Sequence, residues 1–506
     1  MSQIKSGIAL SYLSLAIINV VGILFTPYLI NTLGNHEYGV FSIVGGLMGM
    51  LSLINFGLGG TLVRFIAKYR GEKDTKGTEN LLALSLILFT ALGVIMLIAG
   101  LTVAYNLALL FPNLATEDIE LVKVMFIILA VSTAVSLPGI VFHCIQVAYE
   151  RFIFSKVLEI IKTLVRVVAI VALLAQGHKA IAVIAVDAVV LLVTFLLNVL
   201  YVFKKMNVNI KLHNIDAPLL MSVFKYSFWF AVGMLVTQLT WNSGQLILAR
   251  TGATTDVAIF AVAVALSGYF IAIATAISNV YSPKASFMEG AGAKDDDFSH
   301  MLINIGRSQL FIVGLFLVGF IAIGKSFIYL WLGGDYISSF YVTCLLILPV
   351  VLSISQSFAT SVVQAKNLIA KSAIIKLVLA CISVIAAYVS SLHYGLFGVA
   401  VSLSICWLLN LVFLNVFYQF YVKLDVIKFM RQCWLPFLPS FAVATGLGLY
   451  LSHVFIVNNW FDLFISAALI AVIYLVLTVT FYLNTKERKQ VYKFMRINKM
   501  LKVRYD

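Results

Sequence analysis

Three charged residues lie on one predicted transmembrane helix, and their spacing places them on a single face. Glu159, Lys162 and Arg166 are separated by three and then four residues within the apolar segment 157–176, and residues at that spacing are neighbours on a helix surface. Arg166 is about eleven residues from the nearest basic loop, which puts it about 16 Å deep, close to the bilayer midplane. A charge at that depth has to be paired or has to face water.

Asp187 is the predicted partner of Arg166, because it lies on the next apolar segment, 181–203, roughly 10 Å from the outer side. Two interpretations of this pair are open: an ion pair that fixes helix packing, or a group that takes part in substrate binding or ion coupling. Glu159 and Lys162 are expected to form an i,i+3 pair near the cytoplasmic interface.

A polar cluster interrupts the apolar segment 222–249. Its members carry amide, hydroxyl and indole groups: Gln238, Thr240, Trp241, Asn242, Ser243 and Gln245. The first apolar segment, 7–30, contributes Tyr12, Ser14 and Asn19. Amides beside an aromatic face suit a sugar, and we select Gln238, Trp241, Asn242 and Asn19 as candidate substrate-binding residues. Hydrogen bonding between helices is the alternative, and for any single residue it has the slightly stronger case.

Further cations lie near both predicted mouths of a pathway. Arg64, Arg307 and Lys376 are one or two turns in from basic loops, and Lys123 and Arg250 are near the outer side. Each can extend to the interface. If they face inward instead, the path is cationic and suits a phosphate or an acidic sugar. Arg64, Arg250, Lys162 and Arg166 therefore join the candidate substrate-binding residues.

Composition identifies the solvent of this chain. Of 506 residues, 62% are hydrophobic and 11% are charged, and the mean hydropathy is +1.04, whereas soluble domains carry about 25% charged residues. The sequence therefore predicts an all-α polytopic membrane protein. The apolar segment that follows Lys5 is too long for a cleavable signal peptide, so we expect it to remain as the first span. The five cysteines include no CxxC pair, which indicates neither disulfides nor a metal site.

Fourteen spans are expected, at 7–30, 38–63, 81–111, 121–147, 157–176, 181–203, 222–249, 257–282, 301–332, 339–364, 373–391, 396–421, 437–457 and 462–483. Their loops alternate between cation-poor and basic. By the positive-inside rule the basic loops are cytoplasmic, so both termini lie inside. The net charge of +14 is then mostly a topological signal and does not indicate nucleic acid. The basic tail is either a helix on anionic lipid or a solvated end.

An internal repeat organises these spans. The stretch 33–74 has a weaker copy at 252–295, an offset of about 220 residues. Gly34 corresponds to Gly252, Gln146 to Gln364, and Gly177 to Gly395. The predicted parts are a first six-helix bundle, a cytoplasmic linker, a second six-helix bundle, two additional helices and a basic tail, at 1–205, 206–221, 222–421, 422–483 and 484–506. Two bundles in the same orientation can rock to open a cavity on alternate sides.

Catalytic chemistry has little support. Residues 319–326, GFIAIGKS, fit a phosphate-loop pattern, but that pattern requires a strand, a helix and a nucleotide domain, and this copy lies inside a span. The outer loops are too short to build a catalytic site. No enzyme activity, metal or cofactor is predicted.

The residues of the repeat resemble a known family. YGVFSI after LGNHE, then INFGLGGTLVRFIAKYRGEKD, and the second-half NVYSPKASFMEGAGAKD are similar to bacterial oligosaccharide flippases. These form the polysaccharide-exporter branch of the multidrug/oligosaccharidyl-lipid/polysaccharide superfamily. The resemblance implies a MATE-like fold of two pseudo-symmetric six-helix bundles plus two C-terminal helices. It also implies movement of an undecaprenyl-pyrophosphate-linked repeat unit, of O-antigen lipopolysaccharide or capsule, across the bacterial inner membrane.

We therefore expect a flippase that works by alternating access, with membrane lipid and a lipid-linked oligosaccharide as partners. Polymerase and chain-length components of the same pathway are further partners that the resemblance implies. A proton or sodium gradient is the expected driving force, and Asp187 is the coupling candidate. The alternatives are a drug/cation antiporter or a peptidoglycan-precursor flippase of the same fold, and, with less support, a membrane polysaccharide polymerase.

Overall fold

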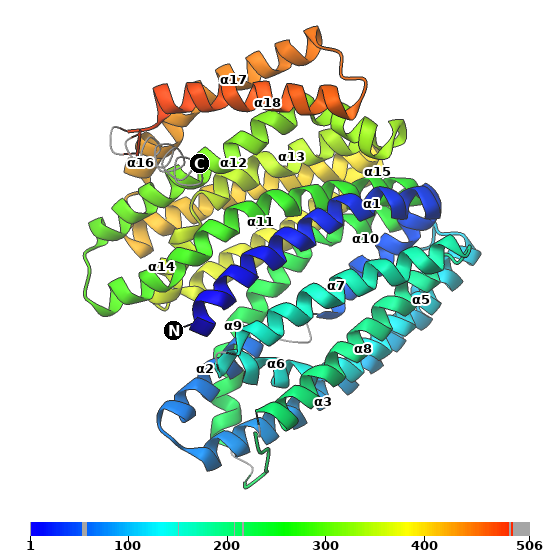
Figure 1. Ribbon diagram of the computed structural model, residues 1–506, viewed down its shortest axis with the longest axis vertical. Helices are drawn as coiled ribbons and strands as arrows, with labels where there is room; N and C mark the ends of the chain where they lie inside the picture. The colour runs from blue at the N-terminus through cyan, green and yellow to red at the C-terminus, as the bar shows by residue number, and fades with distance from the viewer. Residues whose placement is uncertain are drawn as a thin grey trace, which may run out of the picture. The chain divides into compact units, whose positions relative to one another are not determined.

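Every regular element in the part of the chain that the structure describes is a helix, as expected for the predicted fold class (Figure 1). This computed structural model describes residues 2–52, 58–149, 151–206, 208–214, 217–484 and 487–488. The helices of its first part are α1 (Ser2–Leu51), α2 (Leu58–Gly71), α3 (Thr75–Tyr105), α4 (Leu107–Leu110), α5 (Thr116–Ser136), α6 (Gly139–Ala148), α7 (Phe152–Ala175), α8 (Ala180–Lys205), α9 (Ala217–Trp241), α10 (Ser243–Thr251) and α11 (Thr254–Gly290).

The remaining helices complete the chain. They are α12 (Asp295–Leu332), α13 (Ile337–Ile354), α14 (Ser357–Ala365), α15 (Ile369–Phe417), α16 (Val426–Phe429), α17 (Leu435–Val454) and α18 (Trp460–Leu477). Short π-helical segments follow α15, α16 and α18. Breaks between α5 and α6 and between α13 and α14 fall inside the fourth and tenth predicted spans.

Ten segments of the described chain are long and apolar enough to cross a membrane. Two of them, Leu13–Leu51 and Ile369–Val422, have 39 and 54 residues, more than the roughly 20 that one crossing needs. Each contains a non-helical glycine, Gly34 or Gly395. α7 is not among the ten, and it carries the charged face. The chain is a multi-pass membrane protein, and the count of fourteen remains a prediction.

Gly395 reverses the direction of α15. Its φ of 53° and ψ of −133° interrupt the helix. On either side of it, the hydroxyls of Ser390 and Ser402 lie 2.6 Å apart, although twelve residues of straight helix would separate them by about 18 Å. α15 is therefore two antiparallel helices joined by a tight turn. A Cβ on Gly398 would lie 2.4 Å from the Ser390 carbonyl oxygen, so this close approach requires glycine.

α1 reverses in the same way at Gly34, where φ is 79°. The Tyr28 hydroxyl donates to the Val171 carbonyl near the end of α7. Glu37 then pairs with Lys179, just before α8, at 2.9 Å. Ser52, just after α1, lines the same cavity as residues of the first turns of α7. The two halves of α1 therefore run in opposite directions along α7.

Two compact units divide the chain. Residues 1–265 and 369–410 form one, and residues 266–368 and 411–506 form the other. We call them unit 1 and unit 2. Their boundaries differ from those of the two sequence repeats, and the boundaries of the repeats remain a prediction.

Unit 1 is built around α5, which packs against α3 and α8. Small residues allow this contact: a Cβ on Gly93 would lie 2.6 Å from the Ala134 carbonyl oxygen, and one on Gly100 would lie 2.9 Å from the Ala130 Cβ. Close approach through small residues is how membrane helices gain packing energy where lipid is as apolar as the side chains.

The loops of unit 1 gather into two groups that match the predicted sides. On the predicted outer side, His36 Nε2 lies 2.8 Å from Asp118 Oδ1, and His36 Nδ1 lies 2.7 Å from the Thr254 hydroxyl. On the opposite side, Arg70 donates to the Ala148 carbonyl oxygen at 3.0 Å. Loops predicted to share a side are thus in contact, which supports the alternation of loops. The assignment of the basic side to the cytoplasm remains a prediction.

Of the three correspondences of the predicted repeat, one has the same backbone geometry in both copies. Gly177 and its repeat partner Gly395 both have a positive φ. Gly34 also has a positive φ, but its repeat partner Gly252 does not. The Gln146 amide donates to Asn198 at 2.8 Å. The equivalent bond in unit 2 runs from Gln356 to Asn415 at 2.7 Å. Gln356 therefore has the role that the sequence offset assigns to Gln364.

Candidate functional site

The Arg166–Asp187 ion pair is present, as predicted, between α7 and α8. Arg166 Nη2 lies 2.9 Å from Asp187 Oδ2, and Arg166 Nε donates to Asp187 Oδ1. Two parallel hydrogen bonds make the pair bidentate, the strongest geometry for these groups. The Phe25 ring lies 6.0 Å from the guanidinium carbon. The structure confirms the pairing, while a role in binding or coupling remains a proposal.

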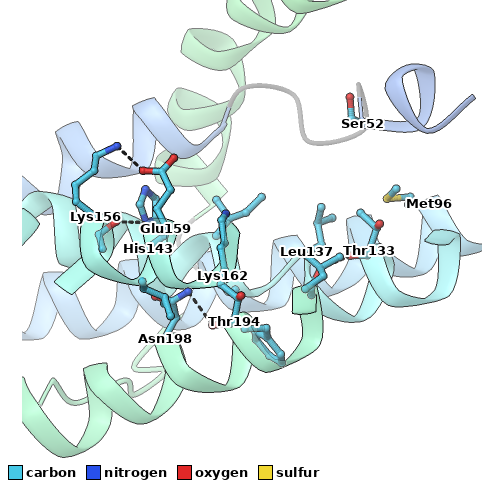
Figure 2. A pocket seen from close by; sticks show the side chains of 17 residues that line it. Ser52, Met96, Thr133, Leu137, His143, Lys156, Glu159, Lys162, Thr194 and Asn198 are labelled. Carbon is cyan, nitrogen blue, oxygen red and sulfur yellow. Dashed lines mark hydrogen bonds and ion pairs between the residues drawn. The ribbon is translucent and has the colours of Figure 1, made fainter. Parts of the chain in front are cut away.

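A cavity of about 470 Å³ lies beside this pair in unit 1. We call it the α5–α8 cavity, because residues of α5, α6, α7 and α8 line it, with Ser52 and Met96 at one end. Figure 2 shows Lys156, Glu159 and His143 at the opposite end and Lys162 between the two. Its polar lining residues are Ser52, Thr133, Ser136, His143, Ser155, Lys156, Glu159, Lys162, Thr194 and Asn198.

The charges of the α5–α8 cavity do not pair as predicted. Lys156 Nζ lies 2.8 Å from Glu159 Oε2, so the expected Glu159–Lys162 pair is wrong. Both lysines stand at helical spacing from Glu159, and the carboxylate takes the one nearer the start of α7. Lys162 lines the cavity and forms no hydrogen bond or ion pair with the described residues.

The opposite walls supply neutral polar groups. Ser155 Oγ lies 3.3 Å from His143 Nδ1. The hydroxyl of Thr194 donates to the Val190 carbonyl oxygen, and the Asn198 amide donates to that of Thr194. Sequence reasoning did not select these residues, because single hydroxyls and amides are common in spans. His143 was the available signal, as an ionisable side chain within a predicted span.

Gln238 and Asn242 bind α1 instead of lining a free surface. Asn242 donates to the Gln238 amide oxygen, Gln238 donates to the Ser52 hydroxyl at 3.1 Å, and Ser52 donates to the Gly49 carbonyl oxygen at 2.6 Å. A Cβ on Gly49 would lie 2.6 Å from Asn242 Nδ2. Gln238 and Asn242 thus make the hydrogen bonds of the alternative interpretation, and through Ser52 they reach the rim of the α5–α8 cavity.

The other candidate residues lie apart from this cavity. The Trp241 ring lies 5.7 Å from that of Trp407. The Asn19 amide bonds to the Leu15 carbonyl oxygen within α1. Arg250 donates to the carbonyl oxygens of Leu109 and Leu110, which end α4, so it acts as a helix cap. The side chain of Arg64 lies outside the described residues.

Arg307 is a structural residue of unit 2. It is 5% exposed, forms two 2.8 Å hydrogen bonds with the Glu487 carboxylate, and lies 4.4 Å from the Tyr482 ring centre. Its donors are committed to the segment that follows α18 and to the Gln432 carbonyl oxygen before α17. The expectation that it could face a pathway is therefore wrong. The described residues also hold no group of three or more His, Cys, Asp or Glu side chains that could bind a metal ion.

Comparisons with solved structures show the fold. The chain is similar to lipid II flippase MurJ in an inward closed conformation, with 16% identity, a TM-score of 0.66, and coverage of 94% of this chain and 98% of that one. It is also similar to an inward-facing multidrug resistance MATE family transporter of the MOP superfamily. There the identity is 17%, the TM-score is 0.63, and coverage is 81% of this chain and 94% of that one.

Comparisons of sequence show the family. No curated protein sequence matches the chain. A family model described as polysaccharide biosynthesis protein matches residues 4–286, more than half of the chain and all of the helices that form the α5–α8 cavity. This protein is therefore a member of the polysaccharide biosynthesis protein family, with the fold of the MATE transporters and MurJ.

Proposed function

We propose that this protein moves an undecaprenyl-pyrophosphate-linked oligosaccharide repeat unit from the inner to the outer leaflet of the bacterial plasma membrane by alternating access. The observation that carries the proposal is the α5–α8 cavity, a polar and cationic space within an otherwise apolar helical unit of a polysaccharide biosynthesis family member. Polar groups inside a membrane protein are expensive and mark substrate or ion pathways. A repeat unit of surface polysaccharide, such as O-antigen or capsule, is the ligand that fits both facts.

Each part of the substrate has a chemical counterpart in the proposal. Hydroxyls and amides of the cavity hydrogen-bond the sugars. Arg166 attracts the pyrophosphate, and the polyprenyl tail remains in lipid. A proton or sodium gradient resets the cycle. Asp187 is the coupling group in this scheme, because a proton on its carboxylate removes the counter-charge of Arg166 and frees the guanidinium.

Two rivals share the fold. A drug/cation antiporter requires carboxylates without partners in its cavity, whereas Glu159 and Asp187 are both paired with cations. A peptidoglycan-precursor flippase has the same kind of substrate, a lipid-linked sugar, and the fold alone does not separate it from the proposal. Cooperation with polymerase and chain-length components follows from the proposed pathway.

The test deletes the gene and follows the lipid-linked sugar. We expect intact lipid-linked repeat units to accumulate on the inner leaflet while cell-wall synthesis continues. Single units that reach the outer surface and remain unpolymerised would instead identify a polymerase, and arrest of wall synthesis would identify the peptidoglycan rival. Unchanged surface polysaccharide would contradict the proposal.

A further inference from the structure

The α5–α8 cavity carries an uncompensated positive charge. Three of its lining residues have acidic or basic side chains: Lys156, Glu159 and Lys162. Lys156 and Glu159 neutralise one another at 2.8 Å, which leaves Lys162. Lys162 is exposed to the cavity, and a cation within a membrane span is stabilised by a counter-ion or by water. The nearby Glu159 carboxylate is hydrogen-bonded to Lys156, so the described residues give Lys162 no carboxylate of its own, and the geometry points to an anion supplied by the ligand.

The charge count favours a monoanion. One lysine matches one carboxylate, whereas a pyrophosphate carries at least two charges and is typically held by several cations or by the planar fork of arginine. The nearest guanidinium on α7, that of Arg166, is already occupied by both oxygens of Asp187. The cavity therefore matches a carboxylate better than a diphosphate.

Two hydroxyls of the wall are hydrogen-bond acceptors. The hydroxyl protons of Ser136 and Thr194 are donated to backbone carbonyl oxygens, so the remaining lone pairs of both oxygens can only accept. Sugar hydroxyls are donors that satisfy such acceptors. A volume of about 470 Å³ lies within the range of small-molecule sites. A sugar ring with one carboxylate matches Lys162 and these two hydroxyls.

We propose that the α5–α8 cavity is a subsite for an acidic sugar, a hexuronic acid residue of the translocated unit, whose carboxylate binds Lys162 Nζ. The hydroxyls of Ser136 and Thr194 accept hydrogen bonds from the ring hydroxyls. This inference rests on the proposed function and adds the substrate class to it. It makes this protein selective for repeat units that contain a uronic acid over neutral ones.

Binding to the full-length chain in lipid nanodiscs tests the subsite directly. Calorimetric titration with methyl β-D-glucuronoside should show saturable binding, and the uncharged methyl β-D-glucoside should bind about 10–100-fold more weakly, as expected for loss of one charge-assisted contact. Lys162→Gln should remove this preference, and Lys162→Arg should retain it. Lys325→Gln, at an exposed lysine of α12, is the matched control and should bind as the wild type does.

Each other outcome overturns the inference. If the glucuronoside binds no better than the glucoside, or if Lys162→Gln keeps the preference, the carboxylate assignment is wrong. If inorganic pyrophosphate displaces the glucuronoside through Lys162 at equal concentration, the site is a diphosphate site. Lys162 is exposed and unpaired within the described structure, so these variants are expected to fold, and their thermal unfolding is measured alongside.

A cellular assay separates this inference from the proposed function. The wild type and Lys162→Gln are each supplied with a uronate-containing and a neutral lipid-linked unit. The inference expects Lys162→Gln to lose export of the uronate-containing unit alone. Equal export of both units by both proteins contradicts the subsite but leaves the flippase proposal standing. Failure of the wild type to move either unit contradicts the flippase proposal itself.

Discussion

At the scale of single residues, most charged side chains of the predicted spans that we singled out have an oppositely charged partner. Arg166 and Asp187 satisfy each other, Lys156 satisfies Glu159, and Arg307 is committed to Glu487. Removing one member of an ion pair leaves the other charge without its partner, whereas removing Lys162 does not. Substitutions at the two kinds of position should therefore affect different properties. The ion pairs should affect stability first, and Lys162 should affect ligand binding first.

The Arg166–Asp187 pair predicts a specific pattern in a double-mutant cycle. Asp187→Asn leaves a guanidinium without its counter-charge and should lower the free energy of unfolding by about 2 kcal/mol. Arg166→Gln should cost a similar amount. The double variant should lose less than the sum, because neither partner is then left charged and alone. Thermal unfolding of the purified protein in detergent measures all three.

Export by the same variants separates packing from function. Arg166→Glu should abolish export while the protein remains in the membrane, because it places a second carboxylate beside Asp187. If the charge-swapped variant Arg166→Asp/Asp187→Arg restores stability but not export, the pair has a function beyond packing. Normal export by Arg166→Glu would show that the cation at this position is dispensable.

Glu487 makes stability depend on pH. Burial raises the pKa of its carboxyl, but hydrogen bonds from Arg307 and from the Asn484 amide outweigh burial, so the pKa is lowered from its ordinary value of 4.5. A carboxylate with a lowered folded-state pKa stabilises the fold above the unfolded-state value and loses that contribution as pH falls through the folded-state value. Glu487→Gln should therefore lower the melting temperature at pH 7.

The difference between wild type and Glu487→Gln should begin to shrink as pH falls below 4.5, the ordinary pKa, and should be lost as pH falls through the lowered folded-state pKa of Glu487. Melting curves in detergent, recorded at closely spaced pH values between about pH 3.5 and 7, measure this difference in melting temperature. Glu117→Gln, at an exposed carboxylate in the first turn of α5, is the control. A constant difference across this range would show that the Arg307–Glu487 contact does not depend on ionisation.

At the scale of helices, hydropathy, loop charge and helical spacing predicted most of the elements. They placed the helices, the reversals near Gly34 and Gly395 and the Arg166–Asp187 contact, because each follows from local spacing or from the period of the helix. They did not predict that Glu159 pairs with Lys156 or that Arg307 is buried against Glu487. Both Lys156 and Lys162 have i,i+3 spacing from Glu159, so the spacing allows either pair and the rotamers decide between them. The burial of Arg307 depends on a contact between segments 180 residues apart, which no local pattern encodes.

The contact between α1 and the start of α11 depends on one glycine. A Cβ on Gly39 would lie 2.0 Å from the Thr254 carbonyl oxygen, a backbone atom that a side-chain rotation cannot move, whereas a Cβ on Gly45 would meet nothing within 4 Å. Gly39→Ala should therefore cost about 1–3 kcal/mol of stability through overpacking. Gly45→Ala, on the same helix, should be neutral or slightly stabilising. Thermal unfolding compares the two, and equal melting temperatures would contradict the close approach.

At the scale of the whole molecule, the contacts between loops support the predicted alternation. In unit 1 the loops near His36, Asp118, Lys179 and Thr254 meet through hydrogen bonds and ion pairs. Local hydropathy cannot show which loops touch, but loop charge predicted which loops share a side. The observed loop contacts and the loop charges agree because loops on one side of a membrane are separated by an even number of crossings.

The folding back of α15 turns this agreement into a test of topology. If Gly395 is a turn at the outer surface, His393 and Lys423 lie on opposite sides of the membrane, although one continuous helical segment, Ile369–Val422, precedes Lys423. In a cysteine-free background, His393→Cys should react with a membrane-impermeant maleimide in intact cells, and Lys423→Cys should react only after lysis. Glu117→Cys is the outer reference and Lys73→Cys the inner one. If His393→Cys and Lys423→Cys label alike, α15 does not supply two crossings and the count of fourteen is wrong.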